Sequence, residues 1–138
     1  MSSLVFVYGT LKSGQSRESV LINQRYIGIA KTTENYALFD LGSFPALVHA
    51  RPNLAAARKI YGELYEVQDD CIAKLDQIEG VDFNLYSREI ITLEEINLVN
   101  LPIHNDNFRL LHSKKAEAYI YLQDTSKHRE CGFFWSSR

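Results

Sequence analysis

Short runs rich in β-branched and aromatic residues recur along the chain, and helices do not alternate with them. The runs with the composition and length of strands are 4–8, 26–32, 36–41, 46–49, 59–67, 86–93 and 117–122. A parallel βαβ fold needs a helical crossover between its strands. The order therefore predicts an α+β fold on a mostly antiparallel or mixed sheet, which can close as a small barrel.

One segment carries a clear helical stripe. The apolar residues that recur there at helical spacing are Ile72, Leu75 and Ile78. Asp69 and Asp70 precede them and offer side chains that can cap a helix, and Gly80 stands where a glycine ends one. A second, shorter helix can begin at Ser16 and run through Ile22.

The size and charge of the chain narrow its class. Its 138 residues predict a single domain spanning 1–138. Fifteen basic and seventeen acidic residues give a net charge of −2, so no overall basic excess indicates a nucleic-acid partner. No apolar run approaches the roughly 20 residues that span a bilayer, so we expect no membrane partner. The start lacks a basic segment, so Leu4–Val7 is interpreted as a strand and not as a signal peptide.

The cysteine and histidine spacing favours neither a metal site nor a disulfide framework. Cys71 and Cys131 are far apart and form no CxxC pair, which fits a reducing, cytoplasmic location. The histidines show no HxxxH or HExxH spacing; they are His49, His104, His112 and His128. We therefore expect no metal.

Glu63 lies in the middle of the predicted strand 59–67. Alternation places it on one face with Tyr61, Tyr65 and Val67, opposite a face that holds Ile60, Gly62, Leu64 and Glu66. If the face of Glu63 points inward, the carboxylate is desolvated beside aromatic rings, and a desolvated carboxylate is a stronger general base. The alternative is a glutamate on a solvated sheet face, since glutamate is seldom buried unpaired.

The predicted strand 4–8 runs into a turn that contains Gly9 and Thr10. A glycine there permits close approach of a ligand, and free N–H groups of such a turn can bind a carboxylate or an oxyanion. The stretch 9–16 has glycines at the first and sixth positions of a phosphate-binding loop, but Gln15 replaces its lysine. A nucleotide site is therefore disfavoured, and a plain turn from strand to loop remains the alternative.

Several segments in order along the chain carry a more specific signal. They are Phe6-Val7-Tyr8-Gly9-Thr10-Leu11-Lys12-Ser13-Gly14-Gln15, Phe44-Pro45-Ala46-Leu47, Tyr61-Gly62-Glu63-Leu64-Tyr65, Leu75-Asp76-Gln77-Ile78-Glu79-Gly80, Tyr86-Ser87-Arg88 and Ala118-Tyr119-Ile120-Tyr121. Together they resemble the γ-glutamylcyclotransferase-like superfamily, especially the γ-glutamylamine cyclotransferases and their AIG2-like relatives. The resemblance covers residues 4–93 and 116–122, and ordered motifs are more specific than any one alone.

The resemblance implies a small mixed β-barrel flanked by a few short helices, with a cavity at its mouth. It implies that Tyr8, Gly9, Thr10 and Leu11 line this cavity and bind the γ-glutamyl group of a small-molecule substrate. By the same resemblance, Glu63 falls on the catalytic glutamate of the family and would act as general base. The implied reaction is intramolecular aminolysis, which yields 5-oxoproline and a free amine or amino acid without a cofactor or metal.

Further residues and segments keep alternatives open. Tyr86, Arg88 and Tyr119 are expected to bind substrate, although Arg88 can instead form an internal ion pair and Tyr119 can be a core tyrosine. The segment 97–113 covers the cavity or is a surface connector, and 133–135 packs on the barrel or forms an interface. We expect a monomer or weak homodimer. The alternative function is a non-catalytic ligand-binding or regulatory module of the same fold.

Overall fold

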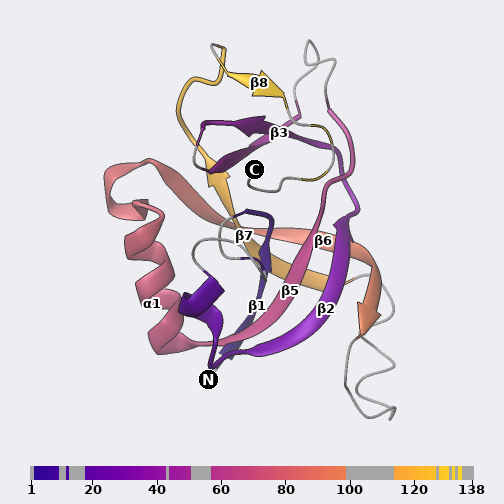
Figure 1. The fold of residues 1–138 in the computed structure, drawn as a ribbon, viewed down its shortest axis with the longest axis vertical. Coiled ribbons are helices and arrows are strands. Elements are labelled where there is room, and N and C mark those ends of the chain that lie inside the picture. Colours follow the sequence, from indigo (N-terminus) through magenta and orange to yellow (C-terminus); the bar gives the residue numbers. More distant parts are fainter. Residues whose placement is uncertain are drawn as a thin grey trace.

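A closed five-stranded barrel forms the body of the molecule (Figure 1). The computed structural model describes residues 2–9, 12, 18–42, 44–50, 57–98, 114–126, 128–130, 132 and 134. In the order of the barrel, the strands are β1 (Ser2–Val7), β5 (Tyr61–Gln68), β2 (Arg25–Thr32), β6 (Tyr86–Leu98) and β7 (Lys114–Tyr121). β1 and β7 pair in parallel, and the other neighbours are antiparallel. The predicted mixed β-barrel is confirmed.

Alternation along each strand decides what fills the barrel. Phe6 of β1, Leu64 of β5 and Leu93 of β6 are fully buried in one cluster with residues from every other barrel strand. Gly62 lets β1 and β5 approach closely here, because a Cβ at this position would stand 2.5 Å from the carbonyl oxygen of Val7. The opposite face of β1 and β5 points out of the barrel.

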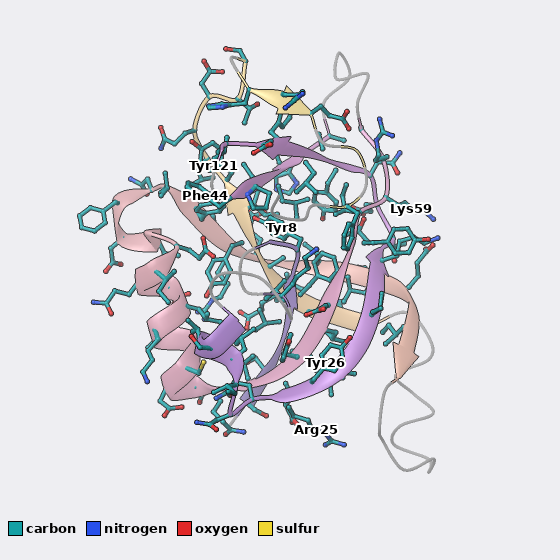
Figure 2. The ribbon with its side chains drawn as sticks, viewed as in Figure 1. Tyr8, Arg25, Tyr26, Phe44, Lys59 and Tyr121 are labelled. Atoms are coloured by element: carbon teal, nitrogen blue, oxygen red, sulfur yellow. The ribbon has the colours of Figure 1, made fainter. Side chains whose placement is uncertain are left out.

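A separate three-stranded sheet lies across one end of the barrel (Figure 1). It consists of β4 (Pro45–His49), β3 (Tyr36–Asp40) and β8 (Arg129–Glu130), all antiparallel. Leu38 and Leu47 join the barrel core from this sheet. Figure 2 shows Tyr8 and Phe44 between the two sheets, whereas Arg25 and Lys59 point away from the molecule. β8 was not predicted, because two residues carry no periodic pattern.

Helix α1 (Asp69–Ile78) packs on the outer face of β1 and β5. Of the two end signals predicted for this helix, the glycine after its C-terminus is confirmed and the N-cap is not. Gly80 follows the helix with φ of 65°, as expected of a glycine that ends a helix. The N-cap, however, is Gln68, whose side chain forms no capping hydrogen bond. Asp69 and Asp70 lie inside that turn, where acidic residues favour the helix dipole.

The remaining boundaries shift modestly from the predictions. The short helix expected from Ser16 is, in its described part, the 3-10 turn η1 (Glu18–Leu21). A second 3-10 turn, η2 (Val81–Phe83), follows α1. β6 continues to Leu98, so the first two residues of the segment 97–113 belong to this strand, and residues 99–113 lie outside the described residues. No helix in the described ranges is long and apolar enough to span a membrane.

Candidate active site

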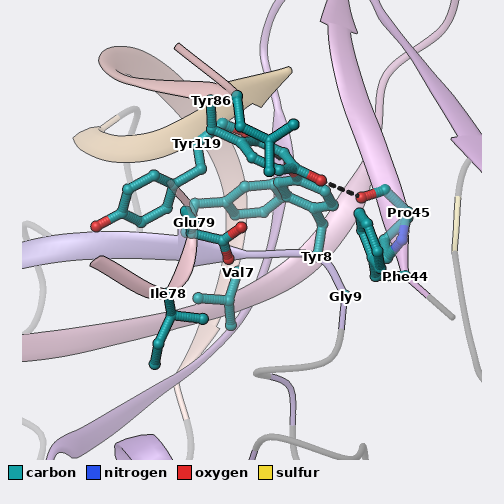
Figure 3. A pocket seen from close by; sticks show the side chains of 11 residues that line it. Val7, Tyr8, Gly9, Phe44, Pro45, Ile78, Glu79, Tyr86 and Tyr119 are labelled. Carbon is teal, nitrogen blue, oxygen red and sulfur yellow. Dashed lines mark hydrogen bonds between the residues drawn. The ribbon is translucent and has the colours of Figure 1, made fainter. Parts of the chain in front are cut away.

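A cavity of about 250 Å³ opens where β1 ends, between the barrel, the end of α1 and the small sheet (Figure 3). Its lining residues come from segments far apart in sequence: Phe6, Val7, Tyr8, Gly9, Phe44, Pro45, Ile78, Glu79, Leu85, Tyr86 and Tyr119. Four predicted substrate-binding residues are among them, namely Tyr8, Gly9, Tyr86 and Tyr119. Thr10 and Leu11 lie outside the described residues.

The end of β1 forms one wall of the cavity. The hydroxyl of Tyr8 donates a buried hydrogen bond to the carbonyl oxygen of Tyr119 at 2.6 Å. Burial raises the pKa of Tyr8 well above its usual value, and the neighbouring Tyr86 and Glu79 raise it further. Tyr8 is therefore a neutral donor at physiological pH. Gly9 follows directly, and a Cβ there would stand 2.6 Å from the ring of Pro45.

Two more tyrosines are fixed by their hydroxyls. Tyr86 donates to the carbonyl oxygen of Pro45 at 2.9 Å, which ties β6 to the start of β4 (Figure 3). Tyr119 donates to Oδ1 of Asp76 on α1 at 2.7 Å. Burial raises the pKa of Tyr119, and the hydrogen bond to Asp76 raises it further. These rings are rigid parts of the wall.

Glu79 supplies the one carboxylate among the lining residues that the structure describes. It is the C-cap residue of α1, and its backbone N–H bonds to the carbonyl oxygen of Leu75 at 2.9 Å. Gly80 then turns the chain through a left-handed conformation. Figure 3 shows the side chain of Glu79 beside Val7 and the ring of Tyr8. Its negative charge raises the pKa of both Tyr8 and Tyr119, which agrees with this closeness.

Glu63 is not among the residues that line this cavity. Gly62 and Leu64 on either side of it are buried on the barrel's inner face, so Glu63 lies on the outer face, where it is half-buried. Its Oε1 accepts a hydrogen bond from the hydroxyl of Tyr65 at 3.2 Å. The alternative of a partly solvated sheet face fits better. Its catalytic role stays a prediction.

Arg88 forms internal ion pairs. Its Nη1 is 3.5 Å from Oδ2 of Asp76, and its Nε is 3.4 Å from Oε1 of Glu117. This is the alternative that the sequence left open, and Arg88 does not line the cavity. It lies behind Tyr119, because both side chains contact Asp76.

Two other features concern the metal-ligating side chains and the aromatic segment near the end of the chain. Within the described residues, no group of three or more His, Cys, Asp or Glu side chains could hold a metal ion. Of the aromatic segment 133–135, only Phe134 is described, and its half-exposed ring covers the ammonium of buried Lys12 at 3.5 Å.

Sequence reasoning missed Glu79, although a signal was present. Glu79 follows buried Ile72 and Leu75 by seven and four residues, so it continues the apolar stripe of α1. A glutamate on the buried stripe, directly before a helix-ending glycine, predicts a carboxylate turned toward the core.

Comparisons with known proteins agree with this architecture. A family model described as "Gamma-glutamyl cyclotransferase, AIG2-like" matches residues 5–135. The chain is 38% identical, over 66% of its length and 73% of the other, to a Vibrio cholerae protein whose name places it among the gamma-glutamylcyclotransferases. It is 36% identical to gamma-glutamylaminecyclotransferase B of Danio rerio over 66% of this chain, and the match spans about half of that protein (49%).

A solved structure shares the fold. The AIG2-like protein from Mus musculus superimposes with a TM-score of 0.74 over 91% of this chain and 81% of its own, at 22% identity. At that identity the likeness concerns the fold alone.

Proposed function

Because the chain belongs to the gamma-glutamyl cyclotransferase, AIG2-like family, we propose that it closes the γ-glutamyl group of a small substrate into 5-oxoproline. The α-amine of that group attacks its own γ-carbonyl carbon, and a five-membered ring forms. The bond between this carbon and the leaving nitrogen breaks, and the attacking amine's proton ends on the leaving amine. The step balances without water, a redox partner or a metal.

Glu79 is the general base in this proposal. The observation that carries it is the position of its carboxylate, which lies in the cavity among Val7, Tyr8 and Tyr119. An attacking amine must be neutral, and a carboxylate in the same cavity can take its proton and pass it to the leaving nitrogen. Glu63, on the outer face, has no such position relative to this cavity.

The energetic demand on the site is moderate. Proton transfer from a model α-ammonium, with a pKa near 8, to a model glutamate near 4.3 is uphill by about 5 kcal/mol. Desolvation of a carboxylate and precise placement of an intramolecular nucleophile both reduce such a gap. The apolar side chains of Phe6, Ile78 and Leu85 in the cavity wall support both effects.

The end of β1 is the proposed binding element. In this proposal the backbone N–H of Gly9, a residue that lines the cavity, stabilises the oxyanion that develops on the γ-carbonyl. Thr10 and Leu11 stay proposed contacts of the γ-glutamyl group on the family resemblance. Tyr86 and Tyr119 also line the cavity.

The test is release of 5-oxoproline from a panel of γ-glutamyl amines and γ-glutamyl amino acids. We expect Glu79→Gln to lower kcat by about 10²-fold or more, the usual range for a general base, and to remain folded. Glu63→Gln is the matched control, since it makes the same change on the outer face, and we expect its kcat to stay near that of the wild type. The reverse result would return the base to Glu63.

The same panel separates the enzyme from a binding module. Binding of 5-oxoproline by calorimetry, without release from any panel compound, would overturn the proposed activity and favour the module. The panel also identifies the leaving amine.

A further inference from the structure

A chain of four polar side chains lies directly behind the cavity wall. Asp76 of α1 accepts the hydroxyl of Tyr119 on Oδ1 at 2.7 Å and faces the guanidinium of Arg88 from Oδ2 at 3.5 Å. Arg88 in turn faces Glu117 at 3.4 Å. The chain therefore links the helix to β6 and β7, and both oxygens of Asp76 have a partner.

Asp76 stands three residues before Glu79 on the same helix. Residues at this spacing lie on one face of a helix, one above the other. The last turn of α1 contains no basic residue. The contacts of Asp76 with Tyr119 and Arg88 are polar ties between this end of α1 and strands β7 and β6.

The environment of this chain suits a fixed arrangement. The side chains of Asp76, Arg88 and Glu117 are 29%, 29% and 26% exposed, so water reaches them only in part. The ring of Tyr119 is buried and lines the cavity. The raised pKa of Tyr119 keeps its hydroxyl protonated as a donor. Hydrogen bonds to a charged acceptor are short and strong, and the bond from the hydroxyl of Tyr119 to Asp76 measures 2.7 Å.

We propose that Asp76 is a positioning residue for the base: through Tyr119 and Arg88 it holds the end of α1 against the barrel and so keeps the carboxylate of Glu79 in the cavity. The inference rests on the proposed function, in which Glu79 accepts the proton of the attacking amine. Asp76 itself does not line the cavity and touches no reacting atom.

The test compares two aspartates of one helix. Asp76→Ala removes both ties, whereas Asp70→Ala makes the same change at the other end of α1, where the carboxylate only accepts the N–H of Cys71. We expect Asp76→Ala to lower kcat by about 10- to 100-fold with KM changed less than about threefold, since misplacement of a reacting group acts mainly on kcat. Asp70→Ala should leave both parameters unchanged.

Two further variants separate positioning from general destabilisation. Tyr119→Phe keeps the ring but loses the donor, and its effect on kcat should not add to that of Asp76→Ala. In a Glu79→Gln background, Asp76→Ala should leave the residual rate unchanged, whereas loss of folded protein would lower it. All rates are measured below the melting temperature of the least stable variant.

The outcomes distinguish the inference from the proposed function. If the wild type releases 5-oxoproline and Asp76→Ala keeps its kcat, the inference is overturned and the function stands. If no panel compound is turned over, the function fails, and the inference is then judged by the crystal structure of Asp76→Ala. A Glu79 carboxylate that stays in the cavity there would overturn it, and a displaced one would support it.

Discussion

Glu63 and Glu79 are both half-buried glutamates near tyrosines, yet they occupy different kinds of place. Glu63 sits in mid-strand on the outer face of the barrel and bonds to Tyr65 at 3.2 Å. Glu79 is the C-cap residue of α1, and it lines the cavity together with Ile78. The cavity lies where different elements meet, and of these two carboxylates it is that of Glu79 which lines it.

The two positions are nevertheless neighbours in one respect. Glu63 pairs in register with Val7, which lines the cavity. Variants on the outer face of β5 can therefore be compared directly with variants in the cavity wall. The predictions below compare the two regions.

The largest effect is expected at Gly9. A Cβ there would stand 2.6 Å from Cδ and Cγ of Pro45, and Tyr86 holds the carbonyl oxygen of Pro45 at 2.9 Å, so neither side yields easily. Gly9→Ala should lower kcat/KM by about 100-fold, as expected for a displacement of about 1 Å, and lower the unfolding free energy by about 1–3 kcal/mol. Kinetics of 5-oxoproline release and urea unfolding measure the two effects.

The control for this variant is Ile29→Ala on the outer face. Ile29 pairs in register with Glu63 and is 45% exposed, so its truncation removes little buried surface. We expect unchanged kcat/KM and a loss of stability below about 1 kcal/mol. Equal activity of Gly9→Ala and the wild type would mean that the cavity is not the active site.

The sequence predicts most of the fold because strand alternation and the helical stripe are local properties. Alternation separates Gly62 and Leu64 from Glu63 onto the two faces of β5. It does not say which of these faces points into the barrel. What covers the inward face is the closure of the barrel, with Leu38 and Leu47 of the small sheet, and this depends on long-range contacts. Tyr8, Gly9, Tyr86 and Tyr119 were found because the family motifs mark them, and Glu79 was overlooked inside a motif already noted.

The next prediction compares the two regions through the free energy of unfolding at alkaline pH. The pKa of Tyr8, beside the cavity, is raised well above 10, mainly by burial. Above pH about 10 the unfolded chain loses this proton while the folded state keeps it, so stability falls by about 1.4 kcal/mol per pH unit. Tyr8→Phe should remove that contribution to the slope. The contribution is fully present below the unfolded pKa and is lost as pH rises toward the folded one.

Tyr26 on the outer face is the comparison. Its pKa is also raised, first by burial and then by the charge of Glu63, but Tyr26 remains partly exposed. Tyr26→Phe should therefore leave most of the alkaline slope in place. Urea unfolding at a series of pH values from about 9 to 11 measures the slopes, and a larger change for Tyr26→Phe would show that the outer face holds the more deeply buried hydroxyl.

The smallest effect is expected from two matched hydroxyl deletions at neutral pH. Tyr8→Phe leaves the carbonyl oxygen of Tyr119 without a buried donor at 2.6 Å, which should cost about 1–2 kcal/mol of unfolding free energy. Tyr65→Phe removes a longer bond of 3.2 Å to Glu63, where water can replace the lost donor, so we expect less than about 0.5 kcal/mol. Because Tyr8 also shapes the cavity wall, its variant alone should change kcat/KM. If Tyr65→Phe were the more damaging of the two, the bond to Glu63 would contribute more to stability than its exposure implies.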